Sequence, residues 1–149
     1  MSVEVAFTAH EVEAISSAAP TDGAHDVIEA WQESGRPLAV VSDNGAAAIC
    51  VYLDLSVVLT LIDFVSARSS PDAALLKPSS DLLGLAAAAL HGSPGECVRL
   101  LATLSDIQAA HRAEVRSIGG ANKLGKLGRL AEADADAVTE VLGGLVGVS

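Results

Sequence analysis

The sequence predicts an α/β fold, a three-layer, Rossmann-like arrangement in which helices cover both faces of a parallel sheet. Apolar runs of strand length alternate with amphipathic segments of helix length, which favours strand–helix–strand units with right-handed crossovers. The run at residues 38–41 is continuously apolar, as expected for a strand buried on both faces, and residues 97–101 predict a second buried strand. With 149 residues, the chain is long enough for one domain with a core. Because residues are 50% hydrophobic but only 3% aromatic, aliphatic side chains must build that core.

The first half of the chain contains the clearest helix boundaries. Thr8 and Glu11 have the spacing of a capping box, which predicts a helix up to about Ser17. Apolar positions repeat at helical spacing over residues 24–34, and Gly35 suits the end of that helix. The elements expected next are a buried strand at 38–41, a helix at 46–55 and a weak strand at 64–66.

The second half continues the alternation. Ser79 or Ser80 can cap a helix over residues 81–90. The elements expected after it are strands at 97–101, 115–118 and 136–138, the last a short edge strand, and helices at 105–113, 124–133 and 139–145. This order again indicates a parallel sheet whose strands are joined by helical crossovers.

The charge and hydropathy of the chain exclude several classes of partner. A net charge of -10 repels phosphate backbones and anionic lipids, so we expect neither a nucleic-acid nor a membrane partner. Residues 46–65 are apolar over a length that could span a bilayer, but Asp54 lies near their middle and Asp63 near their end. Because a mid-span carboxylate costs about 3 kcal/mol, a buried helix followed by a buried strand explains this segment better.

The cysteines and the N-terminus favour a cytoplasmic protein. Cys50 and Cys97 are far apart and form no Cys-x-x-Cys or Cys/His cluster, so we expect two reduced, buried thiols. The first residues lack a basic region followed by an apolar stretch, and they therefore predict no secretory signal.

Several short segments, in this order and spacing, carry a family resemblance. They are Pro20-Thr-Asp-Gly23, Leu38-Ala-Val-Val-Ser-Asp-Asn44, Leu75-Leu-Lys-Pro78, Pro94-Gly-Glu-Cys-Val98, Ser105-Asp-Ile107, Val115-Arg-Ser-Ile-Gly119 and Asn122-Lys123. From about Thr8 onward, the chain resembles haloacid dehalogenase-like (HAD-like) phosphatases of the phosphoglycolate phosphatase-like group. Each motif alone is weak, and the specificity lies in their combination.

The resemblance implies a phosphoryl-transfer site. In this family an aspartate attacks the phosphoryl group, a second aspartate acts as acid and base, and Mg²⁺ bridges carboxylates and phosphate. By position, Ser42 matches the phosphate-binding hydroxyl of the second motif, with Asn44 beside it, and Lys77 matches the lysine of the third. Asp106 matches the distal acid of the fourth motif and would be a magnesium ligand. The implied ligand is a small phosphorylated metabolite.

From the residues alone, each of these positions has a plainer interpretation. Ser42 could cap the helix that follows it, and Lys77 could be a surface lysine. Asp106 could be a first-turn carboxylate that favours the helix dipole without any metal. Glu11 and Glu13 form a carboxylate pair for which a solvated face is the default expectation.

The chain departs from the family pattern in two places. No apolar run followed by Asp-x-Asp precedes Ser42, so the nucleophile motif is absent. In the fourth motif, Leu101 and Ala102 stand where the family has Gly-Asp, so a second metal ligand is missing. One remaining carboxylate does not hold a hydrated Mg²⁺ tightly. The chain alone is therefore expected to be inactive, either a pseudoenzyme or a truncated enzyme.

The missing motif also implies a missing strand. In this family the first strand lies between the strand that ends at Ser42 and the strand that ends near Ala102. Two apolar strand edges would otherwise face a gap, so we expect residues 3–7, or a second copy in a homodimer, to fill it. Residues 1–19 would then be a cap remnant or N-terminal segment, and residues 20–149 the core domain.

Three functions follow from these expectations. The first is an inactive or truncated HAD-like domain with a residual anion pocket of Ser42, Lys77 and Lys123. The second is a phosphatase that is active only as part of a longer or complemented protein. The third is a non-catalytic dimerising or binding module.

Overall fold

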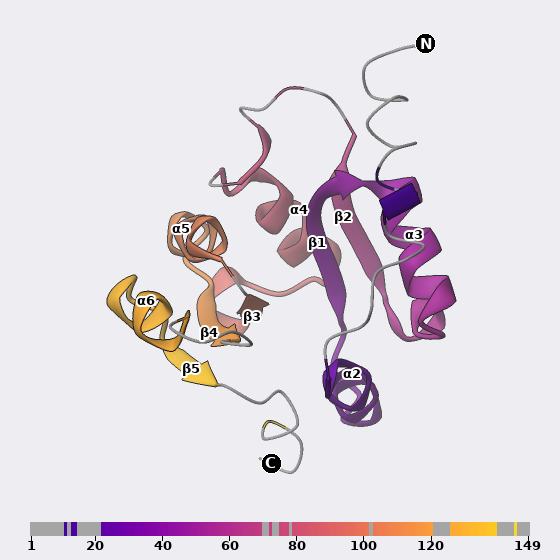
Figure 1. The fold of residues 1–149 in the computed structure, drawn as a ribbon, viewed down its shortest axis with the longest axis horizontal. Helices are drawn as coiled ribbons and strands as arrows, with labels where there is room; N and C mark the ends of the chain where they lie inside the picture. The colour runs from indigo at the N-terminus through magenta and orange to yellow at the C-terminus, as the bar shows by residue number, and fades with distance from the viewer. Residues whose placement is uncertain are drawn as a thin grey trace.

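The computed structural model describes residues 11, 13–14, 22–69, 72, 75–77, 79–101, 103–120, 126–139 and 145. Its elements confirm the predicted α/β class (Figure 1). In chain order they are α2 (Ala24–Glu33), β1 (Ala39–Gly45), α3 (Ala46–Leu55), η1 (Leu59–Leu61), β2 (Phe64–Arg68), α4 (Asp81–Ala89), η3 (Pro94–Glu96), β3 (Val98–Leu101), α5 (Leu104–Arg112), β4 (Arg116–Gly120), α6 (Lys126–Glu132) and β5 (Ala137–Thr139).

The described strands form two separate parallel sheets. One contains β1 and β2, and the other has the order β3–β4–β5. Figure 1 shows the two sheets side by side, with β1 and β3 as the strands nearest to the other sheet. No described strand pairs with both β1 and β3. This is the strand order expected for a sheet whose central strand lies between them.

Helices cover both faces of the first sheet. Neighbouring residues of β1 point to opposite faces, so each of them contacts a different helix layer. Val40 packs against a cluster built around Ile49 and Leu53 of α3. Val41 packs against a second cluster that includes Leu83 of α4 and Leu101 of β3. The first sheet is therefore the middle of the three layers that the sequence predicts.

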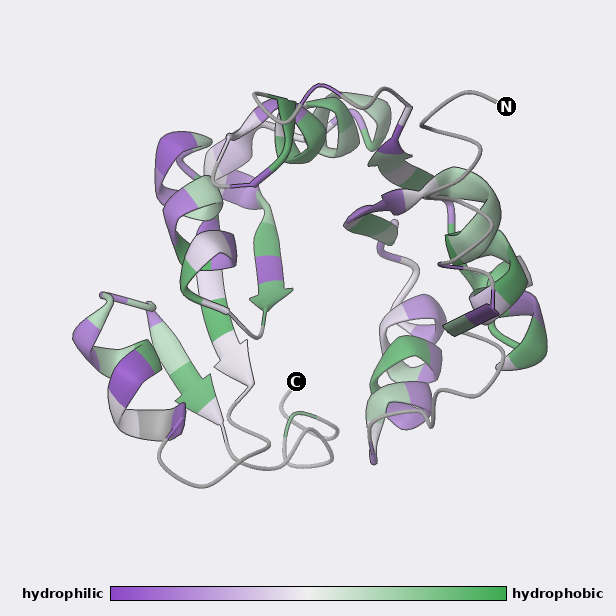
Figure 2. Cartoon of the chain, turned by 45° about the horizontal axis from the view of Figure 1, so that its top comes forward, coloured by the Kyte–Doolittle hydropathy of each residue, from purple (hydrophilic) through white to green (hydrophobic). Residues whose placement is uncertain are grey.

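The second cluster joins the two sheets. Leu83 of α4, a helix that also packs on β1 and β2, meets Leu101 of β3 and Ile107 of α5 in one core. On the same face, a side chain at Gly119 of β4 would run into Leu130 of α6, and Gly119 is the register partner of Leu101. Figure 2 shows that α3 and α4 are apolar over most of their length, as expected for helices packed between other elements.

Most predicted boundaries agree with the structure to within a few residues, including α3 at its predicted bounds. Gly35, at φ +75, follows α2 in the left-handed conformation expected beyond a helix end. β1 and β2 are longer than predicted and continue to Gly45 and Arg68. These extensions place polar side chains at the carboxyl ends of both strands.

The expectation that β3 is a buried strand is wrong for one of its two faces. Leu101 is 4% exposed, but Val98 is 42% and Leu100 40% exposed. Leu101 faces the core shared with α5, whereas Val98 and Leu100 alternate with it and point to the opposite face. The largely apolar run at residues 97–101 therefore marked the strand correctly but did not show which of its faces is covered.

The apolar segment 46–65 is a helix followed by a strand, as predicted. α3 ends at Leu55 and β2 begins at Phe64. Between them, Asp63 accepts a hydrogen bond from the backbone N–H of Leu38 at 2.7 Å and donates its own N–H to the Leu38 carbonyl at 2.8 Å. Within the described residues, no helix is long and apolar enough to cross a membrane.

Several expectations fall outside the described residues. These are the strand at 3–7, the capping residue Thr8, most of the helix up to Ser17 and residues 140–144 of the last predicted helix. The first residue of that helix, Thr139, belongs to β5 instead. Glu11, Glu13 and Ala14 are helical.

Candidate functional site

The carboxyl end of β1 carries three consecutive polar residues, Ser42, Asp43 and Asn44. The Ser42 hydroxyl accepts a hydrogen bond from the Asn44 backbone N–H at 3.1 Å. The N-cap of α3 is Gly45, which provides no side-chain cap, so Ser42 does not cap that helix. Ligands of α/β sheets bind at this edge, where the carboxyl ends of parallel strands meet.

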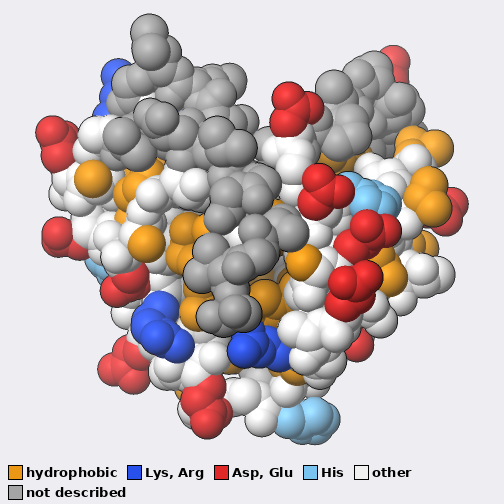
Figure 3. Space-filling model, turned by 90° about the horizontal axis from the view of Figure 1, so that it is seen from below, with side chains coloured by type: hydrophobic (Ala, Val, Ile, Leu, Met, Phe, Trp, Pro, Cys, Tyr) orange, Lys and Arg blue, Asp and Glu red, His pale blue; other side chains and the backbone are white. Residues whose placement is uncertain are grey.

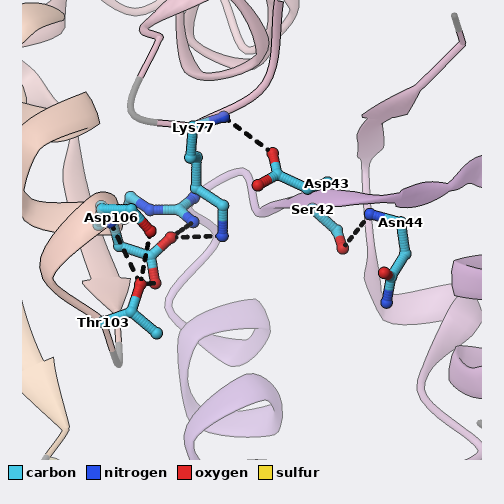
Figure 4. Close-up of polar contacts among 8 residues, drawn as sticks. Ser42, Asp43, Asn44, Lys77, Thr103 and Asp106 are labelled. Atoms are coloured by element: carbon cyan, nitrogen blue, oxygen red, sulfur yellow. Dashed lines mark hydrogen bonds and ion pairs between the residues drawn. The ribbon is translucent and has the colours of Figure 1, made fainter. Parts of the chain in front are cut away.

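Lys77, between β2 and α4, contacts β1 and α5. Its backbone N–H donates to Asp43 Oδ1 at 3.1 Å, and its Nζ donates to Asp106 Oδ1 at 2.6 Å (Figure 4). Asp43 lies near the carboxyl end of β1 in the first sheet, whereas Asp106 belongs to α5, which packs on the second. The Lys77 side chain is only 17% exposed, so the surface-lysine interpretation is wrong.

Asp106 lies in the first turn of α5 and is held from three directions. Besides Lys77, the Arg99 guanidinium of β3 donates to Asp106 Oδ1 at 2.9 Å. Thr103, the N-cap of α5, donates its hydroxyl to Asp106 Oδ2 at 2.9 Å and accepts from the Asp106 N–H at 3.2 Å. We call Asp43, Lys77, Arg99, Thr103 and Asp106 the clasp.

The charged centre of the clasp, where Lys77 and Arg99 meet Asp106, is largely buried. The side chains of Asp106 and Arg99 are 7% and 10% exposed. Burial alone would raise the pKa of Asp106, but the hydrogen bond from Lys77 and the charges of Arg99 and Lys77 outweigh it and hold that pKa well below its usual range. Asp106 is therefore ionised at any physiological pH. One clasp atom, Arg99 Nε, is buried without a hydrogen-bond partner.

A second polar network lies at the same end of the first sheet. The Arg68 guanidinium of β2 donates to both carboxylate oxygens of Glu11 and to the Asp43 carbonyl, the last at 2.9 Å. Glu11 also accepts from the Gly45 N–H at 2.8 Å. We call Glu11, Arg68 and Gly45, with the Asp43 carbonyl, the arginine bridge.

Glu11 is thus not on a solvated face, contrary to expectation. Its side chain is 18% exposed. Burial raises its pKa, but the hydrogen bonds from Arg68 and Gly45 and the charge of Arg68 lower the pKa by more. The pKa of Glu11 therefore lies below its ordinary value. The pairing was not visible in the sequence because Glu11 and Arg68 are 57 residues apart.

The predicted site residues come together only in part. Lys77 and Asp106 are in direct contact. In Figure 4 the Ser42 hydroxyl turns toward Asn44 and away from the Lys77 ammonium. Ala102 and Lys123 lie outside the described residues.

Sequence reasoning missed Asp43, Arg99 and Thr103. Thr103 precedes Asp106 by three residues, which is the spacing of a capping box and could have been found. Arg99 interrupts an apolar run and could have been singled out on that ground. Nothing local marks Asp43 as the residue that contacts Lys77.

The donor set of the clasp does not fit a magnesium ion. The described residues contain no cluster of three or more His, Cys, Asp or Glu side chains placed to hold a metal. Asp106 Oδ1 accepts from two cations and Oδ2 from the Thr103 hydroxyl. A divalent cation beside Asp106 would be repelled by Lys77 and Arg99 at short range.

No family model and no curated protein sequence matches the chain, but solved structures do. A HAD-superfamily hydrolase from Ehrlichia chaffeensis has a TM-score of 0.68 at 19% identity, over 83% of this chain and 54% of that one. CbbY from Rhodobacter sphaeroides has a TM-score of 0.76 at 22% identity, over 92% of this chain and 61% of that one. A putative phosphoglycolate phosphatase from Lactobacillus delbrueckii has a TM-score of 0.75 at 23% identity, over 85% of this chain and 52% of that one. The chain has the HAD-like hydrolase fold.

The HAD-like fold explains the arrangement of the two sheets. The chain spans only about half to three-fifths of the length of these neighbours. The orders β2–β1 and β3–β4–β5 agree with the expectation, from the resemblance, of a further strand between β1 and β3. Figure 3 shows acidic side chains spread over one face of the molecule, in keeping with the strongly negative net charge.

Proposed function

We propose that this chain is a HAD-like domain that does not by itself hydrolyse phosphate esters. The observation that carries the proposal is the clasp, in which Lys77 and Arg99 both donate to Oδ1 of Asp106. In the metal-dependent reaction the lysine must meet phosphoryl oxygens and the carboxylate must meet a cation. Here the two side chains meet each other, and no Asp-x-Asp precedes Ser42 to supply a nucleophile.

The role that the clasp supports is structural. Lys77 binds Asp43 at the end of the first sheet and Asp106 at the start of α5, on the second. The described strands of the two sheets share no ladder hydrogen bonds. The clasp is therefore a charge-assisted cross-link between the two halves, next to the apolar core around Leu83.

A small phosphorylated metabolite is the ligand class that we assign to any residual binding. Lys77 is a cation close to the end of β1, and CbbY has been solved with phosphate and with xylulose-1,5-bisphosphate. An oxyanion here must compete with Asp106 for Lys77, so we expect binding to be weak. Addition of phosphate in a calorimeter should give no heat at micromolar concentrations, and a micromolar dissociation constant would contradict this expectation.

The activity assay is hydrolysis of p-nitrophenyl phosphate with millimolar magnesium. We expect no release above the buffer rate for the chain, nor for Lys77→Met. Magnesium-dependent release that disappears in both Lys77→Met and Asp106→Asn would show that the clasp opens to a working site, and the proposal would be wrong. Loss in neither variant would point to a contaminating phosphatase.

A second candidate is a phosphatase that works only in a longer or complemented protein. The observation in its favour is that β1 and β3 end two separate sheets in HAD-like order. The test fuses or adds a strand that ends in Asp-x-Asp-Gly-Thr. Because Ala102 stands at the place of a metal ligand, we expect this addition alone not to restore full turnover, whereas addition combined with Ala102→Asp should restore more. Normal magnesium-dependent turnover without Ala102→Asp would contradict this interpretation.

A third candidate is a module that binds a second copy through its sheet edges. The exposed side chains of Val98 and Leu100 on β3 favour it, because apolar strand surfaces invite association. Sedimentation velocity at micromolar concentration should then show a dimer that Leu100→Lys converts to a monomer. A monomer at every concentration would exclude this candidate.

We further propose that the protein works in the cytoplasm. Cys50 and Cys97 are both free thiols in the structure, which suits a reducing compartment. Fractionation of cells that express the tagged chain should recover it with cytoplasmic markers.

A further inference from the structure

Arg99 is a charged residue in the middle of the short apolar strand β3. Because side chains alternate along a strand, Arg99 lies on the same face as Leu101, which is part of the core shared with α4 and α5. Its side chain is 10% exposed. A guanidinium cannot lose its charge in a protein, so a buried one requires a counter-charge close by.

Asp106 is the carboxylate that the structure gives to Arg99, and it is already bound by Lys77. Both cations donate to the same oxygen, Oδ1, at 2.9 and 2.6 Å. Arg99 Nε has no partner, and burial of an unsatisfied N–H costs free energy. The bond to Asp106 must therefore offset both the desolvation of the guanidinium and this unpaired donor. Such an arrangement indicates that the charge of Arg99 is needed where it lies.

Two monovalent cations bring to Asp106 the same formal charge as one divalent ion. The resemblance assigns Asp106 to magnesium, yet the donors around it fit a metal poorly. We propose that Arg99 and Lys77 together replace a divalent cation at Asp106, so that this part of the HAD-like fold is assembled without metal. The inference goes beyond the proposed lack of activity, because it concerns what neutralises Asp106 whether or not any reaction occurs.

The chemistry of the two side chains explains why an arginine suits this role. A guanidinium is more weakly hydrated than an ammonium and is therefore more easily buried. It also presents several donors in a fixed plane, so that one can reach Asp106 while the stem packs against apolar neighbours. Lysine at position 99 would keep the charge but lose the planar fork.

The test measures urea unfolding of the full chain with millimolar magnesium or with EDTA. For the unaltered chain we expect the same midpoint in both. Arg99→Met should raise the unfolding equilibrium constant at least tenfold, and Arg99→Lys should recover part of that loss. In an Asp106→Asn background, Arg99→Met should change the constant less than threefold, because its partner charge is already gone.

Arg116→Met is the matched control, since it removes the same charge from an exposed position on the neighbouring strand β4. It should change the unfolding constant less than threefold in either background. Equal effects of Arg99→Met in both backgrounds would overturn the proposal. So would stabilisation of the unaltered chain by magnesium that Asp106→Asn abolishes.

A second measurement does not depend on a variant at Arg99 that folds. Electron paramagnetic resonance of free Mn²⁺ reports metal binding directly in the unaltered chain. We expect the signal of free Mn²⁺ to be the same with the unaltered chain and with Asp106→Asn. A loss of free signal with the unaltered chain alone would place a metal at Asp106 and overturn the proposal. This readout is independent of phosphatase activity. Metal binding at Asp106 would refute metal-free assembly without refuting the proposed lack of activity, and phosphatase activity would refute the latter without refuting the former.

Discussion

The clasp and the arginine bridge lie at the same end of the molecule but balance their charges differently. The bridge pairs one cation, Arg68, with one carboxylate, Glu11, and both carboxylate oxygens bind the guanidinium. The clasp sets two cations against the single carboxylate of Asp106. Loss of the carboxylate would leave two buried cations side by side in the clasp but only one cation in the bridge. The bridge should therefore tolerate the loss of either member better than the clasp tolerates the loss of Asp106. The bridge is also local to the first sheet, whereas the clasp joins both sheets.

The largest expected effect is therefore that of Asp106→Asn. The amide keeps the shape of the side chain but leaves Lys77 and Arg99 without a counter-charge. Removal of one partner from a buried charged group destabilises by about 3–5 kcal/mol, and we expect a loss in this range in urea unfolding. The control is Asp81→Asn, an exposed first-turn carboxylate of α4, which should cost less than about 1 kcal/mol. Equal losses in the two variants would show that the clasp contributes no more than a helix dipole does.

The next effect is on how steeply the free energy of unfolding falls in acid. Because the folded-state pKa of Asp106 lies below its ordinary value of 3.8, its contribution is fully present above pH 3.8 and is lost as pH falls toward the folded pKa. Each unit of pH in that window is worth up to about 1.4 kcal/mol. We expect Asp106→Asn to flatten the fall in stability between about pH 4 and pH 2. An unchanged slope in Asp106→Asn would mean that other carboxylates dominate acid unfolding.

A smaller loss is expected when the arginine bridge is broken. Arg68→Met leaves the Glu11 carboxylate 18% exposed and still bound by the Gly45 N–H, so water and the backbone can compensate in part. We expect a loss of about 1–2 kcal/mol, in the range for hydrogen bonds to charged groups. In a double-mutant cycle, Glu11→Gln and Arg68→Met should couple by about 1 kcal/mol. Strict additivity would show that the bridge contributes nothing beyond its separate members.

The same contrast decides what the sequence could predict. Local patterns were sufficient for helices and strands, because a period of 3.6 or a continuous apolar run is written in adjacent residues, as in α3. They did not reveal that Val98 and Leu100 are exposed, since the cover on a strand comes from distant segments. In the site, the resemblance singled out Lys77 and Asp106, which the structure brings into contact, while their phosphate-binding and metal-ligating roles stay predictions.

Sequence reasoning could not find the partners that make these two residues a clasp. Arg99 reaches Asp106 only because β3 presents it on the same face as the first turn of α5, and that orientation depends on the register of the strand. Glu11 and Arg68 meet across 57 residues of chain. Charged pairs of this kind are a property of the tertiary fold, whereas the capping pair Thr103 and Asp106 is local and could have been predicted.

The smallest effect is expected for a pair that resembles both networks on paper but is solvated. His25 and Glu29 lie one turn apart on α2 at 2.9 Å, with side chains 47% and 53% exposed. Exposed pairs at this spacing contribute at most about 0.5 kcal/mol, because water screens the charges and the side chains lose conformational freedom. We therefore expect His25→Ala to change the free energy of unfolding by less than about 0.5 kcal/mol at pH 7, in low and in high salt alike. A loss as large as that of Arg68→Met would show that burial is not what separates the clasp and the bridge from ordinary surface pairs, and the comparison on which the other predictions rest would have to be replaced.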